Sequence, residues 1–213
     1  MAAHTQEGLT LSEFIWNQSS DLLEEARNTL FIRGVRDGEL DPNFYGIYML
    51  QDGLWCLEVS KIWKEVSRSN REGIDDQIRQ FARESASKYR KGAENIYQGW
   101  NISQIRAGSE AQDYVHFIRA AFKEYAPSVL IATYACVKLW LTLTNELENV
   151  VKEGNPYKVW VDTMKSSGRT AEKQAQLIDT HKGFDRHAAL SMFRMAMQKE
   201  IMFFNRGGDS QHC

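Results

Sequence analysis

The sequence has few residues that interrupt regular structure and few that could cross-link it. Only three of its 213 residues are proline and three are cysteine. A β-sandwich needs turn residues roughly every ten positions, so the scarcity of proline argues against that class. The small, odd number of cysteines argues against a disulfide scaffold and favours a reducing compartment. We therefore expect a cytoplasmic protein.

The sequence also has no excess of charge of either sign. It contains 26 Lys and Arg against 28 Asp and Glu, for a net charge of −2. Without a basic excess to neutralise phosphates, we expect no nucleic-acid partner. The longest apolar run, residues 129–143, is interrupted by Lys138 and is shorter than the roughly 20 residues of a membrane span. The polar first residues do not resemble a signal peptide, and we expect no membrane association.

Apolar residues at helical spacing dominate the rest of the chain. Each proline begins a predicted helix, because proline is tolerated at the first helical position and Asp41 before Pro42 can act as an N-cap. We therefore expect an all-α, single-domain bundle of about eight helices over residues 1–206, with residues 207–213 as a flexible tail. The predicted helices cover residues 12–33, 42–69, 71–100, a segment after Ser109, 127–152, 157–165, 171–180 and 185–205.

Two of these helices, residues 42–69 and 127–152, are apolar on nearly every side. Helices of that kind are surrounded by protein, so both should lie near the centre of the bundle. Polar residues inside them are informative, because a buried polar group is costly unless it has a partner.

Three such residues could carry chemistry: Asp52, Cys136 and Glu200 each lie within an apolar stretch. A buried carboxyl group or thiol at a ligand site is typical of acid–base or nucleophilic catalysis. Each also has a structural interpretation. Asp52 could pair with another helix, Cys136 could pack as a small apolar residue, and Glu200 could lie on a solvated face beside Lys199.

Metal and phosphate chemistry have little support in the sequence. Asp113 and His116 form half of a carboxylate–histidine helix motif, but a di-iron bundle needs a second such pair and two further carboxylates. A hydrogen bond from His116 to a neighbouring helix explains that spacing equally well. The sequence contains no glycine-rich phosphate loop, no HExxH and no GxSxG. We expect no metal and no cofactor.

Three segments, taken in order, carry a family pattern. Residues 30–40 read LFIRGVRDGEL and are followed by Phe44, Tyr48 and Gln51-Asp52, residues 155–163 read NPYKVWVDT, and residues 200–204 read EIMFF. This set resembles the motifs F-x-x-G-x-x-D-G-x-L with Q-D, P-Y-x-x-W-I-x-T-Y and E-Y-x-F-W of the TenA/thiaminase II family. The resemblance covers nearly the whole chain and implies the haem-oxygenase-like all-α fold.

The resemblance also implies a function: hydrolysis of an aminopyrimidine, either thiamin or a product of its degradation, in thiamin salvage. Asp52 matches the carboxylate that holds the aminopyrimidine, Cys136 the nucleophile and Glu200 the glutamate that transfers a proton. By the same resemblance Tyr48 and Tyr114 contact the substrate. Members of the family assemble, so a homo-oligomer, either a dimer or a tetramer, is implied as well.

The sequence departs from the family at three positions of the implied ligand site. Trp55, Trp140 and Met164 stand where the family has tyrosines. Tryptophan offers one N–H donor and no acceptor, so these changes make the pocket wall more apolar. The alternative function is therefore a catalytically altered or inactive TenA-like protein that binds a small heterocyclic ligand in a tryptophan-lined pocket.

Overall fold

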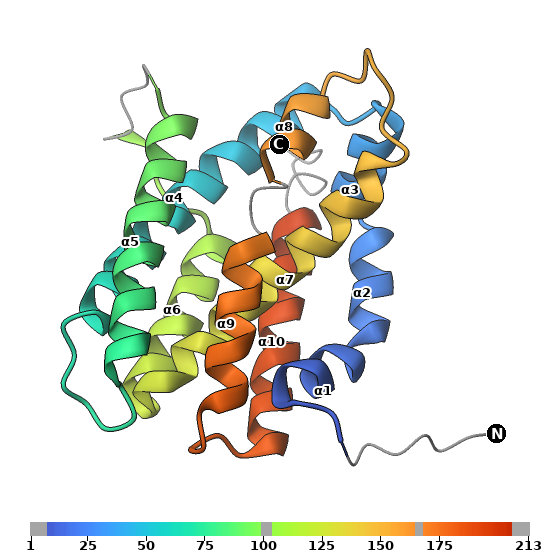
Figure 1. Cartoon of the computed structure of the whole chain (residues 1–213). Helices are drawn as coiled ribbons and strands as arrows, with labels where there is room; N and C mark the ends of the chain where they lie inside the picture. Colours follow the sequence, from blue (N-terminus) through green and yellow to red (C-terminus); the bar gives the residue numbers. More distant parts are fainter. Residues whose placement is uncertain (1–7, 99–103, 165–167, 206–213) are drawn as a thin grey trace.

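The computed structural model describes residues 8–98, 104–164 and 168–205, and all regular structure in these ranges is helical (Figure 1). This confirms the expected all-α bundle. Figure 1 shows α7 crossing the molecule diagonally, and α6, α8, α9 and α10 all pack against it. The elements are α1 (Leu11–Asn17), α2 (Ser20–Arg27), α3 (Leu30–Asp37), α4 (Pro42–Val66), α5 (Asp76–Ile96), α6 (Ser109–Glu124), the 3₁₀ turn η2 (Ala126–Ser128), α7 (Val129–Glu148), α8 (Lys158–Met164), α9 (Gly168–Thr180) and α10 (Arg186–Asn205).

Helix α4 begins where the sequence predicts it. Pro42 occupies the first turn, and the Asp41 side chain accepts hydrogen bonds from the backbone N–H groups of Asn43 and Phe44. These bonds satisfy donors that a helix start otherwise leaves without partners. The helix then continues for 25 residues to Val66, with α5 and α6 packed against it.

Helix α7 lies at the centre, as its apolar sequence predicts. The predicted start at Pro127 is a short 3₁₀ turn, η2, that leads into the α-helix at Val129. Together, residues Ala126–Glu148 are long and apolar enough to span a membrane, but 78% of the apolar window is buried inside the bundle. That degree of burial is typical of the core helix of a soluble protein.

The single helix predicted for residues 12–33 is wrong, because this segment forms α1, α2 and α3. The Ser19 hydroxyl donates to the Ile15 carbonyl at the end of α1, at 2.8 Å. Thr29 caps α3, with its side chain accepting from the backbone N–H of Ile32. Short hydroxyl side chains compete in this way with the backbone hydrogen bonds of a helix. Two of them lie where the predicted single helix is divided into three.

The helix predicted for residues 71–100 begins later, at Asp76. Gly73 has a φ of +80°, a left-handed conformation that ends the preceding segment. Asp75 then caps α5 by accepting from the backbone N–H of Ile78 at 2.8 Å. The predicted end of that helix at Trp100 and the predicted tail at residues 207–213 lie outside the described residues.

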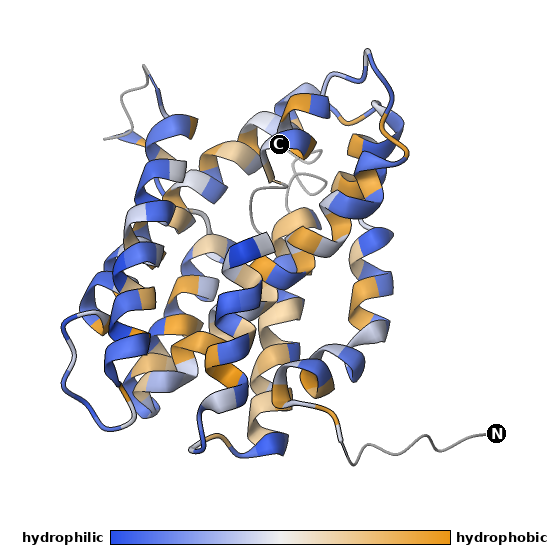
Figure 2. Cartoon of the chain, in the orientation of Figure 1, coloured by the Kyte–Doolittle hydropathy of each residue, from blue (hydrophilic) through white to orange (hydrophobic). Residues whose placement is uncertain are grey.

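Aromatic rings form the part of the core that supports the candidate site. Phe31 is fully buried, and its ring centroid lies 4.1 Å from Tyr48 and 5.4 Å from Trp160. Trp140 packs edge-on against Phe204 at 4.6 Å. Figure 2 shows the apolar residues of α7 and α10 inside the bundle and the polar residues of α5 and α9 outside. Contacts between α3, α4, α7, α8 and α10 thus fix the helices that carry the site.

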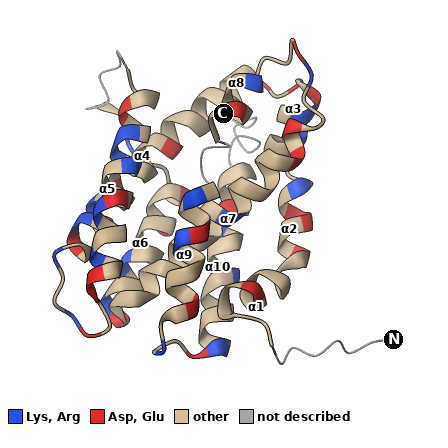
Figure 3. Cartoon of the chain, viewed as in Figure 1, with Lys and Arg blue, Asp and Glu red and all other residues tan. Residues whose placement is uncertain are grey.

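Charged residues of both signs cover the outer helices. In the view of Figure 3, Lys, Arg, Asp and Glu are interspersed along α5 and α9. One pair, Lys173 with Glu84 at 3.0 Å, joins these two helices. Exposed pairs of this kind contribute little to stability, so the fold depends chiefly on its apolar core.

Gly53 of α4 lies in close contact with Tyr97. A Cβ atom at Gly53 would lie 2.5 Å from the Tyr97 ring and 2.7 Å from its hydroxyl, which donates to the Leu50 carbonyl. At Gly46, on the same helix, a Cβ atom would meet no atom within 4 Å. Gly53→Ala should therefore lower the free energy of unfolding by about 1–3 kcal/mol, because Tyr97 must shift.

Gly46→Ala is the matched control and should raise the free energy of unfolding by up to about 1 kcal/mol, because alanine is the better helix former. Urea unfolding of both variants and the wild type measures the difference. Equal stability of the two variants would show that the Tyr97 contact does not constrain α4.

Candidate active site

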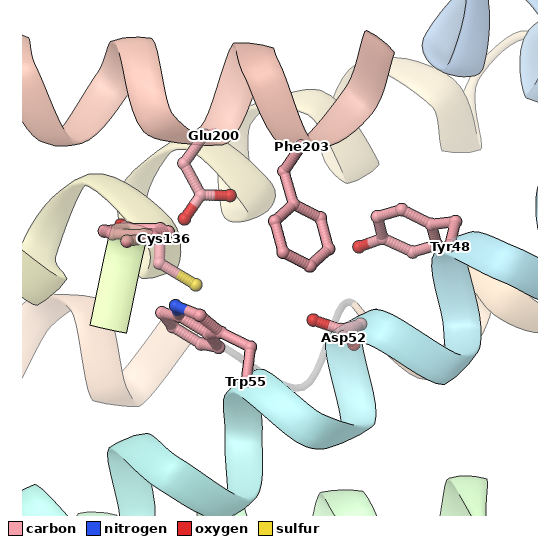
Figure 4. A pocket seen from close by; sticks show the side chains of 7 residues that line it. Tyr48, Asp52, Trp55, Cys136, Glu200 and Phe203 are labelled. Carbon is pink, nitrogen blue, oxygen red and sulfur yellow. The ribbon is translucent and has the colours of Figure 1, made fainter. Parts of the chain in front are cut away.

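Side chains from four helices line one internal cavity. Tyr48, Asp52 and Trp55 lie on one face of α4, because spacings of three and four residues place side chains on the same side of a helix. Figure 4 shows Glu200 and Phe203 descending from α10 on the opposite side, with Cys136 of α7 next to Glu200. The residues that line the cavity are Tyr48, Asp52, Trp55, Tyr114, Cys136, Glu200 and Phe203.

The free space in this cavity is small. The centre of a water molecule can occupy about 10 Å³, which is roughly the space for one water. A ring ligand therefore enters only if aromatic side chains of the wall move. The cavity is partly open to its surroundings, and the Asp52 and Cys136 side chains are only partly buried.

Two carboxyl groups face this space without a neighbouring cation. Burial raises the pKa of Asp52 from 3.8 to about 7. Burial also raises the pKa of Glu200 to about 7, although the facing Tyr114 hydroxyl, Cys136 thiol and Trp140 indole favour its ionised form. No Lys or Arg is among the residues that line the described cavity. Both carboxyls are therefore poised to take up or release a proton near neutral pH.

The Cys136 thiol is held in its neutral form. Burial raises its pKa well above the ordinary value, and the charges of Glu200 and Asp52 raise it further. A cysteine becomes a nucleophile only as the thiolate, so Cys136 needs a base that removes its proton as it reacts. Glu200 faces the thiol across the cavity (Figure 4) and is the group placed to act as that base.

Two donor groups of the cavity wall have no hydrogen-bond partner among the described residues: Trp55 Nε1 and Tyr114 Oη. Both side chains are almost completely buried, with 3% and 1% of their surface exposed. Tyr114 faces Glu200 closely enough to affect its pKa, but the two groups do not reach the geometry of a hydrogen bond. Buried donors without partners are costly, and they are typical of sites that bind a ligand.

The structure brings six of the eight site residues expected from the sequence to this cavity. Trp140 is not in the wall, but its indole interacts with Glu200 and its ring centroid lies 6.2 Å from that of Tyr48. Met164, by contrast, is placed outside the cavity wall. Met164 is partly buried against the core at the end of α8, and Trp160, one turn earlier, packs against Trp140 at 5.1 Å.

Sequence reasoning missed two residues near the reacting groups, Phe203 and Tyr89. Phe203 lines the cavity one turn after Glu200, and this spacing is visible in the sequence. Tyr89 of α5 packs edge-on against Trp55 at 5.7 Å and interacts with Cys136. Neither ring stands out in an apolar helix face, where aromatic residues are ordinary.

The candidate metal motif does not form a site. Asp113 pairs with Lys199 across α6 and α10, and the His116 side chain is exposed. Among the described residues, no group of three or more His, Cys, Asp or Glu side chains is arranged to hold a metal ion.

Several solved structures have the same fold as this chain. A TenA homologue from P. horikoshii OT3 superposes with a TM-score of 0.80 over 93% of this chain and 98% of its own, at 13% identity. A TenA homologue from Pyrococcus furiosus gives 0.79 over 92% and 99%, at 13% identity. The fold is that of the TenA homologues.

Two further structures agree with this TenA-like fold. A protein described as a TenA family transcription regulator, from Silicibacter sp. TM1040, gives a TM-score of 0.80 over 92% of this chain and 96% of its own, at 15% identity. The haem oxygenase of Leptospira interrogans gives 0.64 over 93% and 100%, at 16% identity. No protein-family model matches the sequence, and no curated protein matches it either.

The raised pKa of Asp52 predicts how stability depends on pH. Between about pH 4 and pH 7 the folded state binds more protons at Asp52 than the unfolded state does, so the contribution of Asp52 to stability falls as the pH rises through this window. Asp52→Asn removes the desolvated charge. The variant should be more stable than the wild type at pH 8, by roughly 1–3 kcal/mol, and similar to it at pH 4.

Thermal unfolding at both pH values measures this difference. Asp21 provides a control of opposite sign, because the hydrogen bond and charge of Arg194 lower its pKa to about 2. Asp21→Asn should therefore not gain stability at pH 8. If Asp52→Asn is less stable than the wild type at pH 8, the Asp52 carboxylate has a stabilising partner in the folded protein.

Proposed function

We propose that this protein is a divergent TenA-type hydrolase that acts on an aminopyrimidine, either thiamin or a degradation product of it, in thiamin salvage. The observation that carries this proposal is the convergence of Asp52, Cys136 and Glu200, from three separate helices, on one cavity. A nucleophile, a proton-transfer group and an orienting carboxyl group at one space are the groups that such hydrolysis needs.

Each group has a distinct part in the proposed reaction. Asp52 accepts from the amino group and ring nitrogen of the pyrimidine and fixes its orientation. Glu200 takes the proton from the Cys136 thiol as sulfur forms a bond to an electrophilic ring carbon. Glu200 then gives that proton to the amine as the bond between the amine and its carbon breaks. Water adds to that carbon and gives a proton to Glu200, which returns it to the sulfur as the carbon–sulfur bond breaks. With a pKa near 7, Glu200 can serve as base and then as acid.

A second candidate function is ligand binding without turnover. The cavity holds about one water, and Trp55 stands where the resemblance expects a tyrosine. A site built for polar hydroxyl contacts loses affinity for its substrate when they are replaced. Under this alternative, a small heterocycle would raise the melting temperature but would not be hydrolysed.

The same proposal includes a cytoplasmic location and assembly as a homo-oligomer, a dimer or tetramer. The location is supported by the cysteines of the described residues, Cys56 and Cys136, which are both free thiols, as is usual in a reducing compartment. The assembly rests on the resemblance alone.

The hydrolase proposal predicts that Cys136→Ser abolishes turnover. The protein is incubated separately with thiamin and with 5-aminomethyl-4-amino-2-methylpyrimidine, and release of the pyrimidine alcohol is followed by chromatography. Loss of the nucleophile should reduce the rate by at least about a thousandfold, without unfolding the protein.

Cys56→Ser is the matched control, because Cys56 is a free thiol that is not part of the cavity wall. It should keep most of the activity. Absence of turnover in the wild type, together with a rise in melting temperature on adding either compound, would reject hydrolysis and support the binding function.

A further inference from the structure

Two indole N–H groups of α4, those of Trp55 and Trp63, are buried without a hydrogen-bond partner. Both side chains are almost fully buried, with 3% and 1% of their surface exposed. Only Trp55 lines the cavity. Trp63 instead packs edge-on against Phe81 at 5.4 Å, in the core between α4 and α5. The chain therefore contains one such donor at the site and one away from it.

The Trp55 ring is held in a fixed orientation. It packs edge-on against Tyr89, with ring centroids 5.7 Å apart and an interplanar angle of 77°. Its other neighbour is Tyr114, at 5.1 Å and 37°. Figure 4 shows the indole nitrogen on the edge of the ring that faces Cys136 and Glu200. The N–H thus points toward the reacting groups and cannot turn away from them without breaking both ring contacts.

An indole N–H donates one hydrogen bond and accepts none. Whatever ligand atom meets Trp55 Nε1 must therefore be an acceptor. Tyr114 Oη, which lies in the same wall and is likewise without a partner, can donate to the same atom. Together the two donors can satisfy the two lone pairs of one carbonyl oxygen.

We propose that Trp55 Nε1 and Tyr114 Oη form a subsite for a carbonyl oxygen of the ligand, next to Cys136. This inference rests on the proposed function in one respect, namely that a pyrimidine lies in the cavity with its amino group at Asp52. Trp55 lies one turn after Asp52 on the same face of α4, so the ring substituent next to that amino group is the one that faces Trp55. The ligand class is therefore an aminopyrimidine that carries a carbonyl group on the ring carbon beside its amino-bearing carbon.

The test uses two probes of the same shape, 5-acetyl-4-amino-2-methylpyrimidine and its 5-isopropenyl counterpart, in which CH₂ replaces the carbonyl oxygen. Neither probe has a leaving group, so binding is measured by calorimetry independently of hydrolysis. The wild type should bind the acetyl probe about tenfold more tightly, as expected for one to two neutral hydrogen bonds. In Trp55→Phe this preference should fall to less than about twofold.

Trp63→Phe is the matched control, because it removes the same group from the same helix outside the cavity. It should keep the tenfold preference. If Trp63→Phe loses the preference as Trp55→Phe does, or if the wild type does not distinguish the two probes, the subsite is rejected. Failure of both probes to bind would also reject it.

Tyr114→Phe provides a second variant that removes only a hydroxyl group. Because that hydroxyl has no partner in the folded protein, the variant should not lower the melting temperature of the free protein, while its preference for the acetyl probe should decrease severalfold. A lower melting temperature would show that Glu200 already accepts this hydrogen bond, and would remove Tyr114 from the subsite. A carbonyl preference without turnover of thiamin would reject the hydrolase and leave the subsite standing.

Discussion

The desolvation of two carboxyl groups and a thiol among aromatic rings is the constraint on which the rest of this structure depends. Asp52, Glu200 and Cys136 lie on long helices whose remaining residues are largely apolar, and no cation lines the space between them in the described structure. Water would otherwise stabilise their charged forms, so its exclusion raises the pKa of all three groups. These polar groups are therefore stabilised when a ligand with complementary polar atoms binds beside them.

Supporting this arrangement requires a stiff frame. Tyr48, Asp52 and Trp55 project from the middle of a 25-residue helix, which fixes their spacing independently of any loop. Behind them, rings from α3, α7, α8 and α10 pack around Phe31 and Trp140. The packing of these helices therefore determines the surroundings, and with them the pKa, of the Asp52 carboxyl group.

Much of the fold could be predicted from the sequence, because its strongest signals are local. Asp41-Pro42 is a start signal whose capping bonds form within three residues, and the apolar run after Pro127 admits only a buried helix. The division of residues 12–33 into three helices could not be predicted. It depends on the hydrogen bonds that the Ser19 and Thr29 hydroxyls make with the backbone. Short polar residues at those positions are compatible with a continuous helix and with a helix end.

The candidate site was predictable to the extent that polar residues inside apolar helices are unusual. Asp52 and Glu200 stand out for that reason, and the resemblance adds Cys136. Phe203 and Tyr89 do not stand out, since aromatic residues in a core are common. Met164 was expected in the wall from its place in a motif, but a motif does not fix which turn of a short helix faces inward, and Trp160 does so here. The unsatisfied state of Trp55 Nε1 is a property of three-dimensional packing alone.

The tightness of the cavity has a kinetic consequence. Because the space in the closed state holds about one water, a ring-sized molecule waits for rings such as Phe203 to swing aside before it can enter. Association is then limited by how often the wall opens rather than by diffusion, and the bound molecule leaves at a rate set by the same motion. A wall that limits both steps lengthens the residence time of the ligand without changing its equilibrium affinity.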